Sequence, residues 1–233
     1  MLQSLCPHAD VQAITDRLAD YNNCRGCRKK YDEPSAANGL DVWRARGHVV
    51  KSIRVVMLSA DQTEFAQPLL VGMADYLVVH NQNAILRTNP LGACLGVSIF
   101  DPAAKVAGIL HSLLPDSGID VARAASQPGM FLDSGLAAML LQARELGARL
   151  ENLTVCVAGG ARILDETSYF NIGHRNFEVL TRLLNELGLK PGAQDVGGLS
   201  NRSMQLRAAT GEVRLKISGQ PKMKILCNPL TTT

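Results

Sequence analysis

The sequence contains no apolar run long enough to cross a bilayer, which takes about 20 residues in helical form. The run from Val106 to Leu114 is interrupted by His111 and stopped by Pro115. Residues 1–10 also lack a basic region followed by an apolar run, so we expect no secretory signal there. These absences predict a cytoplasmic protein that does not insert into membranes.

A stripe of basic residues is also absent. The formal net charge is only +3, from 24 Lys and Arg against 21 Asp and Glu. The one basic cluster comprises Arg25, Arg28, Lys29 and Lys30, and no aromatic side chains are interleaved with it. A nucleic-acid-binding face needs Lys and Arg gathered on one side of the fold. We therefore expect a solvated basic loop here and no nucleic-acid partner.

The six cysteines do not have the spacing of a secreted disulfide scaffold, so in a reducing cytosol they are expected to be free thiols. Near the N-terminus, the ligand types of a Cys₃His zinc site are present as Cys6, His8, Cys24 and Cys27. The Cys6-x-His8 pair is tighter than the usual ligand spacing, which favours ordinary thiols in a loop. We expect no metal site, with zinc binding by these four side chains as the alternative.

The chain length of 233 residues fits one good-sized domain, or one domain with a small appendage. Residues 1–66 carry the only tryptophan, a CxxC and the polar stretch 32–39, so we interpret them as an N-terminal appendage of unknown fold. Within it, residues 11–21 suit a short amphipathic helix and residues 49–58 a strand. Residues 67–233 are then expected to form the main domain.

From about Leu69 onward the hydrophobic pattern is regular enough to predict elements. Two main helices are expected, over Phe131–Leu146 and between Asn171 and Gly188. Strands are expected over Tyr76–Val79, Ala84–Arg87, Leu95–Phe100, Val106–Leu113, Leu153–Ala158, Met204–Ala208 and Val213–Ile217. Strands outnumber helices and mostly adjoin one another, so the predicted class is α+β, with a layered, mixed or mostly antiparallel sheet and two main helices.

The most informative segment brings a cysteine and a histidine together across a predicted hairpin. If residues 101–104 form a four-residue loop, Phe100 faces Lys105, and counting outward places Cys94 opposite His111. The other face of both strands is apolar and comprises Leu95, Val97, Ile99, Val106, Gly108 and Leu110. A one-residue slip would move this apolar set to the wrong side, so the pattern predicts that thiol and imidazole share a face.

That proximity has a chemical consequence. A free cysteine titrates near pH 8.5, and a neighbouring imidazole can take its proton to give an activated nucleophile. The histidine can then protonate a departing amine and activate water. The small Gly92-Ala93-Cys94 turn can offer backbone N–H groups to an oxyanion, and the Thr88 hydroxyl can orient the imidazole. Singly, a cysteine and a histidine in strands are usually packing residues. Together these residues predict a cysteine hydrolase without naming its substrate.

Other residues have simpler interpretations. Cys156 alternates with valines and is expected in the core, and His174 is expected at the surface. Asp133 lies near the start of a predicted helix, where its negative charge interacts favourably with the helix dipole. Gly159-Gly160 ends a strand without the spacing of a nucleotide-binding fingerprint, which favours close packing near the active site.

Several motifs, in this order, make the chain resemble the chemotaxis deamidase family CheD. The resemblance extends from about residue 70 to residue 217, and the Cys–His segment is its most diagnostic part. The motifs are Leu91-Gly-Ala-Cys94-Leu-Gly-Val, His111-Ser-Leu-Leu-Pro-Asp-Ser117, Gln127-Pro-Gly-Met-Phe-Leu-Asp133, Ala158-Gly-Gly-Ala161, Asn171-Ile-Gly-His-Arg-Asn176 and Asp195-Val-Gly-Gly198.

The resemblance implies a Cys–His–Thr triad, matched here by Cys94, His111 and Thr88. It implies a protein-glutamine glutaminase that converts glutamines on the cytoplasmic helices of methyl-accepting chemoreceptors to glutamates, releasing ammonia, with methyl-ester hydrolysis as a side activity in some members. It also implies a fold of layered sheets and helices shared with deamidating bacterial toxins, and no metal or organic cofactor. A CheC-type phosphatase is a second expected partner. The alternative function is a regulatory module that stimulates that phosphatase with little catalysis of its own.

The chain departs from the family pattern in four places. Ala93 stands where serine is usual before the nucleophile, and Asn89-Pro90 replaces a pair that commonly contains glycine, which stiffens the turn. Val196 stands where threonine is usual before Gly-Gly, and Asn201 stands where glycine is usual before Arg202. None of these changes removes a member of the triad.

Overall fold

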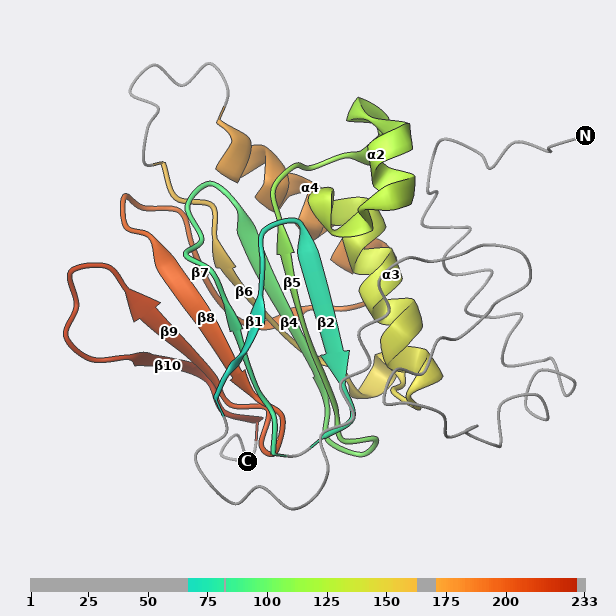
Figure 1. Ribbon diagram of the computed structural model, residues 1–233, viewed down its shortest axis with the longest axis vertical. Helices are drawn as coiled ribbons and strands as arrows, with labels where there is room; N and C mark the ends of the chain where they lie inside the picture. The colour runs from blue at the N-terminus through green and yellow to red at the C-terminus, as the bar shows by residue number, and fades with distance from the viewer. Residues whose placement is uncertain (1–66, 82, 163–170, 230–233) are drawn as a thin grey trace, which may run out of the picture.

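The computed structural model describes residues 67–81, 83–162 and 171–229 (Figure 1). The predicted appendage, with its helix, strand, basic cluster and candidate zinc ligands, lies outside the described residues. The division of the chain at residue 66 therefore stays a prediction.

The described chain forms two five-stranded sheets. Sheet A has the order β1-β3-β8-β9-β10, with β1 at Leu69–Val71, β3 at Ile85–Thr88, β8 at Arg202–Arg207, β9 at Val213–Ile217 and β10 at Lys224–Cys227. Sheet B has the order β2-β5-β4-β6-β7, with β2 at Asp75–Val79, β5 at Val106–Ser112, β4 at Leu95–Asp101, β6 at Thr154–Gly159 and β7 at Pro191–Val196. The β1–β3 and β6–β7 pairs are parallel, and the other pairs are antiparallel.

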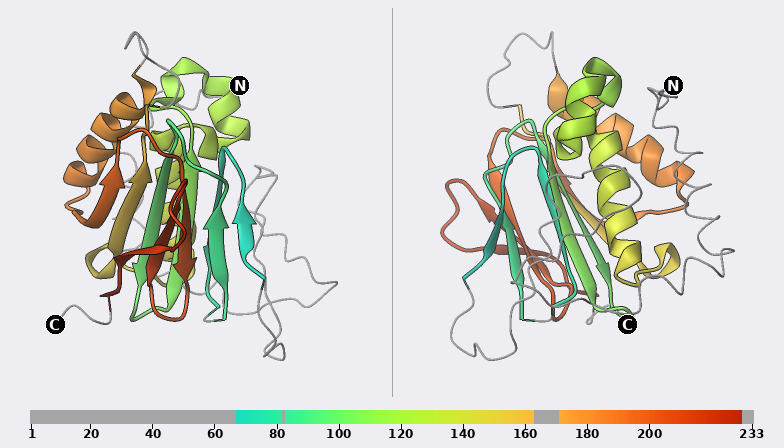
Figure 2. Two further views of the ribbon diagram at one scale, coloured as in Figure 1. Left: turned by 90° about the vertical axis from the view of Figure 1, so that its left-hand side faces the viewer. Right: turned by 45° about the vertical axis from the view of Figure 1, so that its right-hand side comes forward.

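The helices connect these strands on one side of the molecule. They are α2 at Val121–Ser126, α3 at Leu132–Glu145 and α4 at Ile172–Glu186, with short 3-10 turns η2 at Ser117–Ile119, η3 at Pro128–Met130 and η4 at Leu150–Asn152. Figure 2 shows the resulting layers, with sheet A against sheet B and the long helices on the outer face of sheet B. The predicted α+β class, the mostly antiparallel pairing and the two main helices are confirmed.

Two features of the strands go beyond the prediction. The strands belong to two sheets, and β2 and β3 are consecutive in the chain but lie in different sheets. Strands β1, β7 and β10 were not predicted. All three are edge strands with few buried residues, so they lack the alternation of apolar side chains from which a strand is recognised.

Sheet B is the middle layer, and β4 and β5 are buried along their whole length. Alternate side chains such as Val97 and Leu110 pack against α3 and α4. The other set, including Ile109, packs against sheet A. The predicted apolar face is therefore the face that the helices cover, and Cys156 is confirmed in the core between the sheets.

The β4–β5 register differs from the predicted one by two residues. Asp101 pairs with Val106, so the loop comprises residues 102–105 and His111 lies opposite Gly96. Cys94 is thus not directly opposite His111, as the predicted register required. A shift of two residues returns each side chain to the same face, so the predicted sharing of a face survives.

The Asp101 side chain explains the later start of the loop. Its Oδ1 accepts hydrogen bonds from the N–H groups of Ala103 at 2.8 Å and Ala104 at 2.9 Å, and its Oδ2 accepts one from the Arg149 N–H at 2.8 Å. Asp101 is fully buried, and it is the last residue of β4 to pair with β5. Lys105 closes the loop with a φ of 55°, in the left-handed region. The prediction placed Asp101 in the loop because it did not consider that an aspartate side chain can bind the backbone N–H groups of the residues that follow it.

Asp101→Ala tests this turn. The substitution removes the acceptor of three backbone N–H groups, so the free energy of unfolding should fall by about 2–4 kcal/mol in urea denaturation. Asp120→Ala, which removes an exposed helix cap bonded to the Arg123 N–H, is the control and should cost about 1 kcal/mol or less. Equal losses in the two variants would contradict the role given to Asp101.

Candidate active site

The predicted site residues lie at one end of the two sheets, the upper end in Figure 1. Thr88 is the last residue of β3, Cys94 directly precedes β4, and His111 is near the end of β5. Because β4 is antiparallel to both β5 and β6, its start lies beside their ends. The turn before Cys94 is also joined to sheet A, through the bridge between Leu91 and Arg202.

His111 lies in the layer between the sheets and is fully buried. Neither ring nitrogen has a hydrogen-bond partner among the described residues. Burial lowers the pKa of His111 to about 4, and the nearby Val71 carbonyl of β1 opposes this shift only in part. The imidazole is therefore neutral at physiological pH and able to accept a proton.

Cys94 is partly exposed and packs at the margin of the cluster between the sheets. Burial raises the pKa of its thiol, while its own backbone N–H lowers it. His111 lies opposite Gly96, so Cys94 is a diagonal neighbour on the same face, and such neighbours lie roughly 7–8 Å apart between their Cα atoms. In the resting site, the neutral thiol and neutral imidazole are favoured over a thiolate–imidazolium pair.

Thr88 is buried, on the same face of β3 as Leu86, which packs between the sheets. Its Oγ1 accepts a hydrogen bond from the Met204 N–H at 3.0 Å. Thr88 also pairs with Val71, whose carbonyl lies near the imidazole of His111. The fold therefore brings threonine and histidine into one region, but no hydrogen bond joins them within the described part of the chain.

The turn of Gly92 and Ala93 is held by its carbonyl groups. The Gly92 carbonyl accepts from the Ala161 N–H at 2.8 Å, and the Ala93 carbonyl accepts from Asn176 Nδ2 at 3.3 Å. Leu91 exchanges two backbone hydrogen bonds with Arg202, at 2.7 and 3.2 Å. These contacts fix the path of the backbone that leads into the candidate nucleophile.

Gly159 confirms the prediction of close packing at this end. Its φ is +117°, and a Cβ there would collide with the backbone carbonyl of Cys94. Gly173, in the first turn of α4, approaches Gly160 equally closely, since a Cβ would lie 2.6 Å from the Gly160 carbonyl oxygen. The glycines let the end of β6, the start of α4 and the Cys94 turn come together.

Two polar residues near the site were not predicted to matter. Asn176 is fully buried on α4. Its helical spacing from Leu180 and Leu183 places it on the apolar face of that helix, so its burial could have been predicted from the sequence. Arg202 is also buried. Its guanidinium donates to the carbonyls of Gly159 at 2.8 Å, Asp195 at 2.9 Å and Gly197 at 2.7 Å. No pattern in the sequence indicates those contacts, because they are made to backbone carbonyls and not to side chains of a recognisable type.

Besides interacting with the helix dipole, Asp133 binds Ser117. Its carboxylate accepts from the Ser117 N–H at 3.0 Å and from the Ser117 hydroxyl at 2.6 Å. It thus anchors the segment that follows β5 to the start of α3. His174 is at the surface as predicted, with its Nε2 3.2 Å from Glu178 Oε1.

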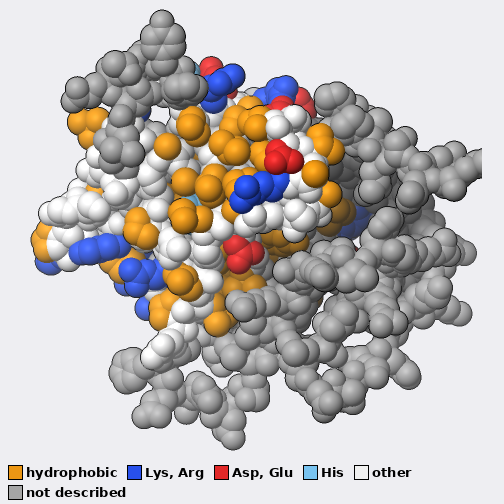
Figure 3. Space-filling model, turned by 45° about the horizontal axis from the view of Figure 1, so that its top comes forward, with side chains coloured by type: hydrophobic (Ala, Val, Ile, Leu, Met, Phe, Trp, Pro, Cys, Tyr) orange, Lys and Arg blue, Asp and Glu red, His pale blue; other side chains and the backbone are white. Residues whose placement is uncertain are grey.

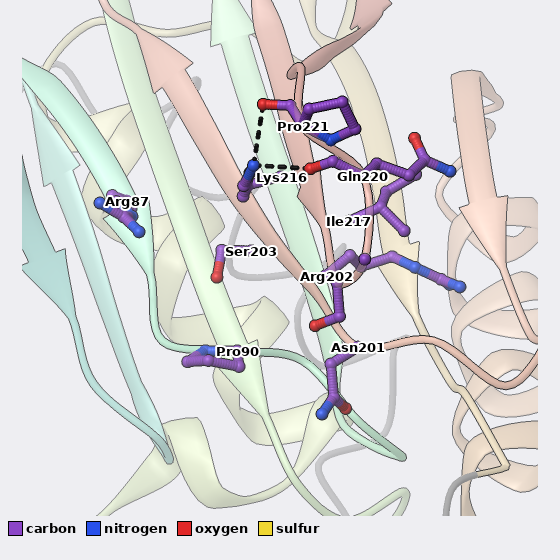
Figure 4. Close-up of a pocket in the computed structure, with 11 residues that line it drawn as sticks. Arg87, Pro90, Asn201, Arg202, Ser203, Lys216, Ile217, Gln220 and Pro221 are labelled. Atoms are coloured by element: carbon purple, nitrogen blue, oxygen red, sulfur yellow. Dashed lines mark hydrogen bonds between the residues drawn. The ribbon is translucent and has the colours of Figure 1, made fainter.

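A pocket of about 470 Å³ lies on the outer face of sheet A (Figure 4). Arg87, Ser203 and Lys216 line it, and Pro90 connects it to the turn that leads to Cys94. Lys216 Nζ donates to the carbonyls of Gln220 and Pro221 at its edge, at 2.7 and 3.1 Å. None of the three predicted triad residues lines this pocket, so it is separate from the candidate chemistry.

Within residues 67–81, 83–162 and 171–229, no group of three or more His, Cys, Asp and Glu side chains is arranged to hold a metal ion. Among the same residues, no helix combines the length and the apolar character needed to span a membrane.

Comparison with known proteins gives consistent matches. A family model described as CheD chemotactic sensory transduction matches residues 113–217. The probable chemoreceptor glutamine deamidase CheD 1 of Syntrophus aciditrophicus is 40% identical over 153 residues, which cover 66% of this chain and 96% of that protein. The probable chemoreceptor glutamine deamidase CheD of Solibacter usitatus is 38% identical over 156 residues, with 67% and 92% covered. The chemoreceptor glutamine deamidase CheD of Thermotoga maritima is 34% identical over 157 residues, with 67% and 96% covered. The segment matched by the family model begins after His111, so it includes none of the three predicted triad residues.

The buried imidazole predicts a specific dependence of stability on pH. The pKa of His111 is about 4 when folded and 6.5 ordinarily, so the unfolded state binds more protons between these values. The contribution of His111 to the free energy of unfolding therefore increases as the pH rises through this window, and it is lost as the pH falls. We expect the loss between pH 7 and pH 5 to be about 2 kcal/mol, and urea denaturation at both pH values measures it.

The comparison is with His111→Gln, which should lose about 2 kcal/mol less than the wild type over the same interval. His174→Gln alters an exposed histidine and should follow the wild type. An unchanged pH dependence in His111→Gln would contradict a neutral, buried imidazole.

Proposed function

This chain belongs to the CheD family, and we propose that it hydrolyses glutamine side-chain amides of methyl-accepting chemoreceptors to glutamates, with release of ammonia. The observation that carries the proposal is the placement of a partly exposed Cys94 and a neutral His111 on one face at one end of sheet B. The relatives that are named for this reaction are covered over nearly their whole length. The reaction takes place in the cytoplasm, where the receptor helices carry the glutamines.

The chemistry has two halves. In the first, the Cys94 sulfur attacks the amide carbon while His111 takes the thiol proton, and the carbonyl oxygen becomes an oxyanion. His111 then gives its proton to the amide nitrogen, the C–N bond breaks, and ammonia leaves a thioester. In the second half, water loses a proton to His111 and attacks the thioester. The C–S bond breaks, the thiol regains its proton, and the product is a glutamate side chain.

The resting site favours neutral partners, which places a demand on this mechanism. Burial raises the pKa of Cys94 and lowers that of His111, so proton transfer without substrate is uphill. Transfer must then be coupled to attack, where hydrogen bonds to the developing oxyanion supply the compensation. In this proposal the backbone N–H groups of the Gly92-Ala93-Cys94 turn act as those donors. The Thr88 hydroxyl orients the imidazole once it becomes charged.

Exposed apolar side chains surround this end of the molecule and support docking of a helix (Figure 3). We call the set the apolar rim, and it comprises Met73, Ile119, Val121, Ile172 and Leu199. Met73 lies in the β1–β2 turn, Ile172 begins α4, and Leu199, which is 77% exposed, lies between β7 and β8. A receptor helix that presents an apolar stripe beside its glutamine would bury this rim while the side chain reaches Cys94.

Cys94→Ala tests the nucleophile. Purified wild type should convert glutamines of a receptor cytoplasmic fragment to glutamates, each with a mass increase of about 1 Da, and Cys94→Ala should lower the rate by at least about 10³-fold because no thioester can form. Mass spectrometry of the digested fragment measures the conversion.

The control is Cys227→Ala, which removes a thiol in β10 and should leave conversion within about twofold of the wild type. Equal conversion by Cys94→Ala and wild type would refute the proposal. Wild-type protein that binds a CheC-type phosphatase and leaves every receptor glutamine unchanged would favour the regulatory module instead.

Leu199→Asp tests the apolar rim. Placing a charge on a surface that the receptor helix buries should raise KM about tenfold with little change in kcat, because binding is weakened and the chemistry is untouched. Ile225→Asp, at an exposed apolar residue of β10 outside the rim, is the matched control and should leave both constants unchanged. A similar KM in the two variants would rule out docking on this rim.

A further inference from the structure

Asn176 connects two parts of the candidate site that are distant in the sequence. Its Nδ2 donates to the Leu113 carbonyl at 2.9 Å and to the Ala93 carbonyl at 3.3 Å. Leu113 follows His111 by two residues, and Ala93 directly precedes Cys94. A single buried amide group therefore ties the strand that carries the base to the turn that carries the nucleophile.

The bond to Ala93 determines the orientation of one peptide group. In a trans peptide the C=O and N–H point in opposite directions, so holding the Ala93 carbonyl toward α4 directs the Cys94 N–H away from α4. That N–H lies on the side of the thiol, where it stabilises the thiolate form. Among the described residues, none accepts a hydrogen bond from the backbone N–H of Ala93 or Cys94.

Packing alone does not explain an asparagine at this position. Asn176 is fully buried, and its Oδ1 has no hydrogen-bond partner among the described residues. An unpaired buried acceptor lowers stability, so packing would favour leucine, as at Leu180 and Leu183 on the same face. The close contact of Gly173 with Gly160 brings the first turns of α4 near the turn that precedes Cys94, so the Asn176 amide is close enough to bind the Ala93 carbonyl.

We propose that Asn176 is a positioning residue for oxyanion stabilisation. By holding the Ala93 carbonyl, it directs the Cys94 N–H at the oxygen of the substrate amide as the tetrahedral intermediate forms. This inference rests on the proposed function, since it concerns the same thiol and the same amide substrate. Asn176 itself touches no reacting atom and acts through the peptide group before Cys94.

Asn176→Leu separates this role from packing, because leucine has nearly the same size and lacks both donor hydrogens. The two readouts are receptor glutamine conversion and alkylation of Cys94 by iodoacetamide, each followed by mass spectrometry. Alkylation displaces iodide at a saturated carbon and never forms an oxyanion, whereas amide hydrolysis does. Asn176→Leu should lower kcat about 100-fold and leave KM within about threefold of the wild type, while the alkylation rate should fall by less than about tenfold, since it depends only on the thiolate.

Asn176→Ala is a second variant that removes the same donors, and thermal melting reports whether each variant folds. Asn185→Leu, at an exposed residue of the same helix, is the matched control and should leave both readouts unchanged. Three outcomes would overturn the proposal: unchanged kcat in both Asn176 variants, equal losses of conversion and alkylation, or failure of both variants to fold.

Cys94→Ala in the same assay distinguishes the two proposals. Conversion that survives in Cys94→Ala would remove the proposed function. Conversion that is lost in Cys94→Ala and complete in Asn176→Leu would remove only the role of Asn176.

Discussion

Burial of the β4–β5 ladder on both faces is the constraint on which the rest of the structure depends. One set of alternate side chains packs against α3 and α4, and the other packs against sheet A. A slip by one residue would exchange the two sets, so the face of every side chain in these strands is determined. His111 is thereby held between the sheets, away from solvent. Cys94 directly precedes the ladder, and part of its side chain is exposed.

The layered class and the central strands could be predicted because their apolar residues repeat with clear periods. Prediction failed at the sheet edges, where β7 and β10 contain no buried residue and so lack an alternating apolar pattern. The prediction did not assign each strand to one of the two sheets. The turn between β2 and β3 is readable, but a turn does not say whether the next strand joins the same sheet or the facing one. That choice depends on burial across layers.

The candidate site shows the same division. The shared face of Cys94 and His111 could be predicted from alternation, but the register was wrong by two residues because the Asp101 carboxylate binds backbone N–H groups within its own turn. Asn176 could have been found, since a polar residue on an apolar helix face is uncommon. Arg202 could not, because its guanidinium contacts groups in two other segments, the end of β6 and the end of β7. Local periodicity determines faces, whereas tertiary hydrogen bonds determine registers and orientations.

Buried polar atoms without hydrogen-bond partners lower the stability of the folded protein. Within the described residues these atoms are both ring nitrogens of His111, Oδ1 of Asn176 and Nε of Arg202. All three residues adjoin one short segment, since Asn176 binds the carbonyl of Ala93, Arg202 pairs with Leu91, and His111 is a diagonal neighbour of Cys94. Unsatisfied buried groups are rare in native proteins because each one is destabilising. Their concentration around the Cys94 turn agrees with the proposed function, in which His111 receives and returns a proton.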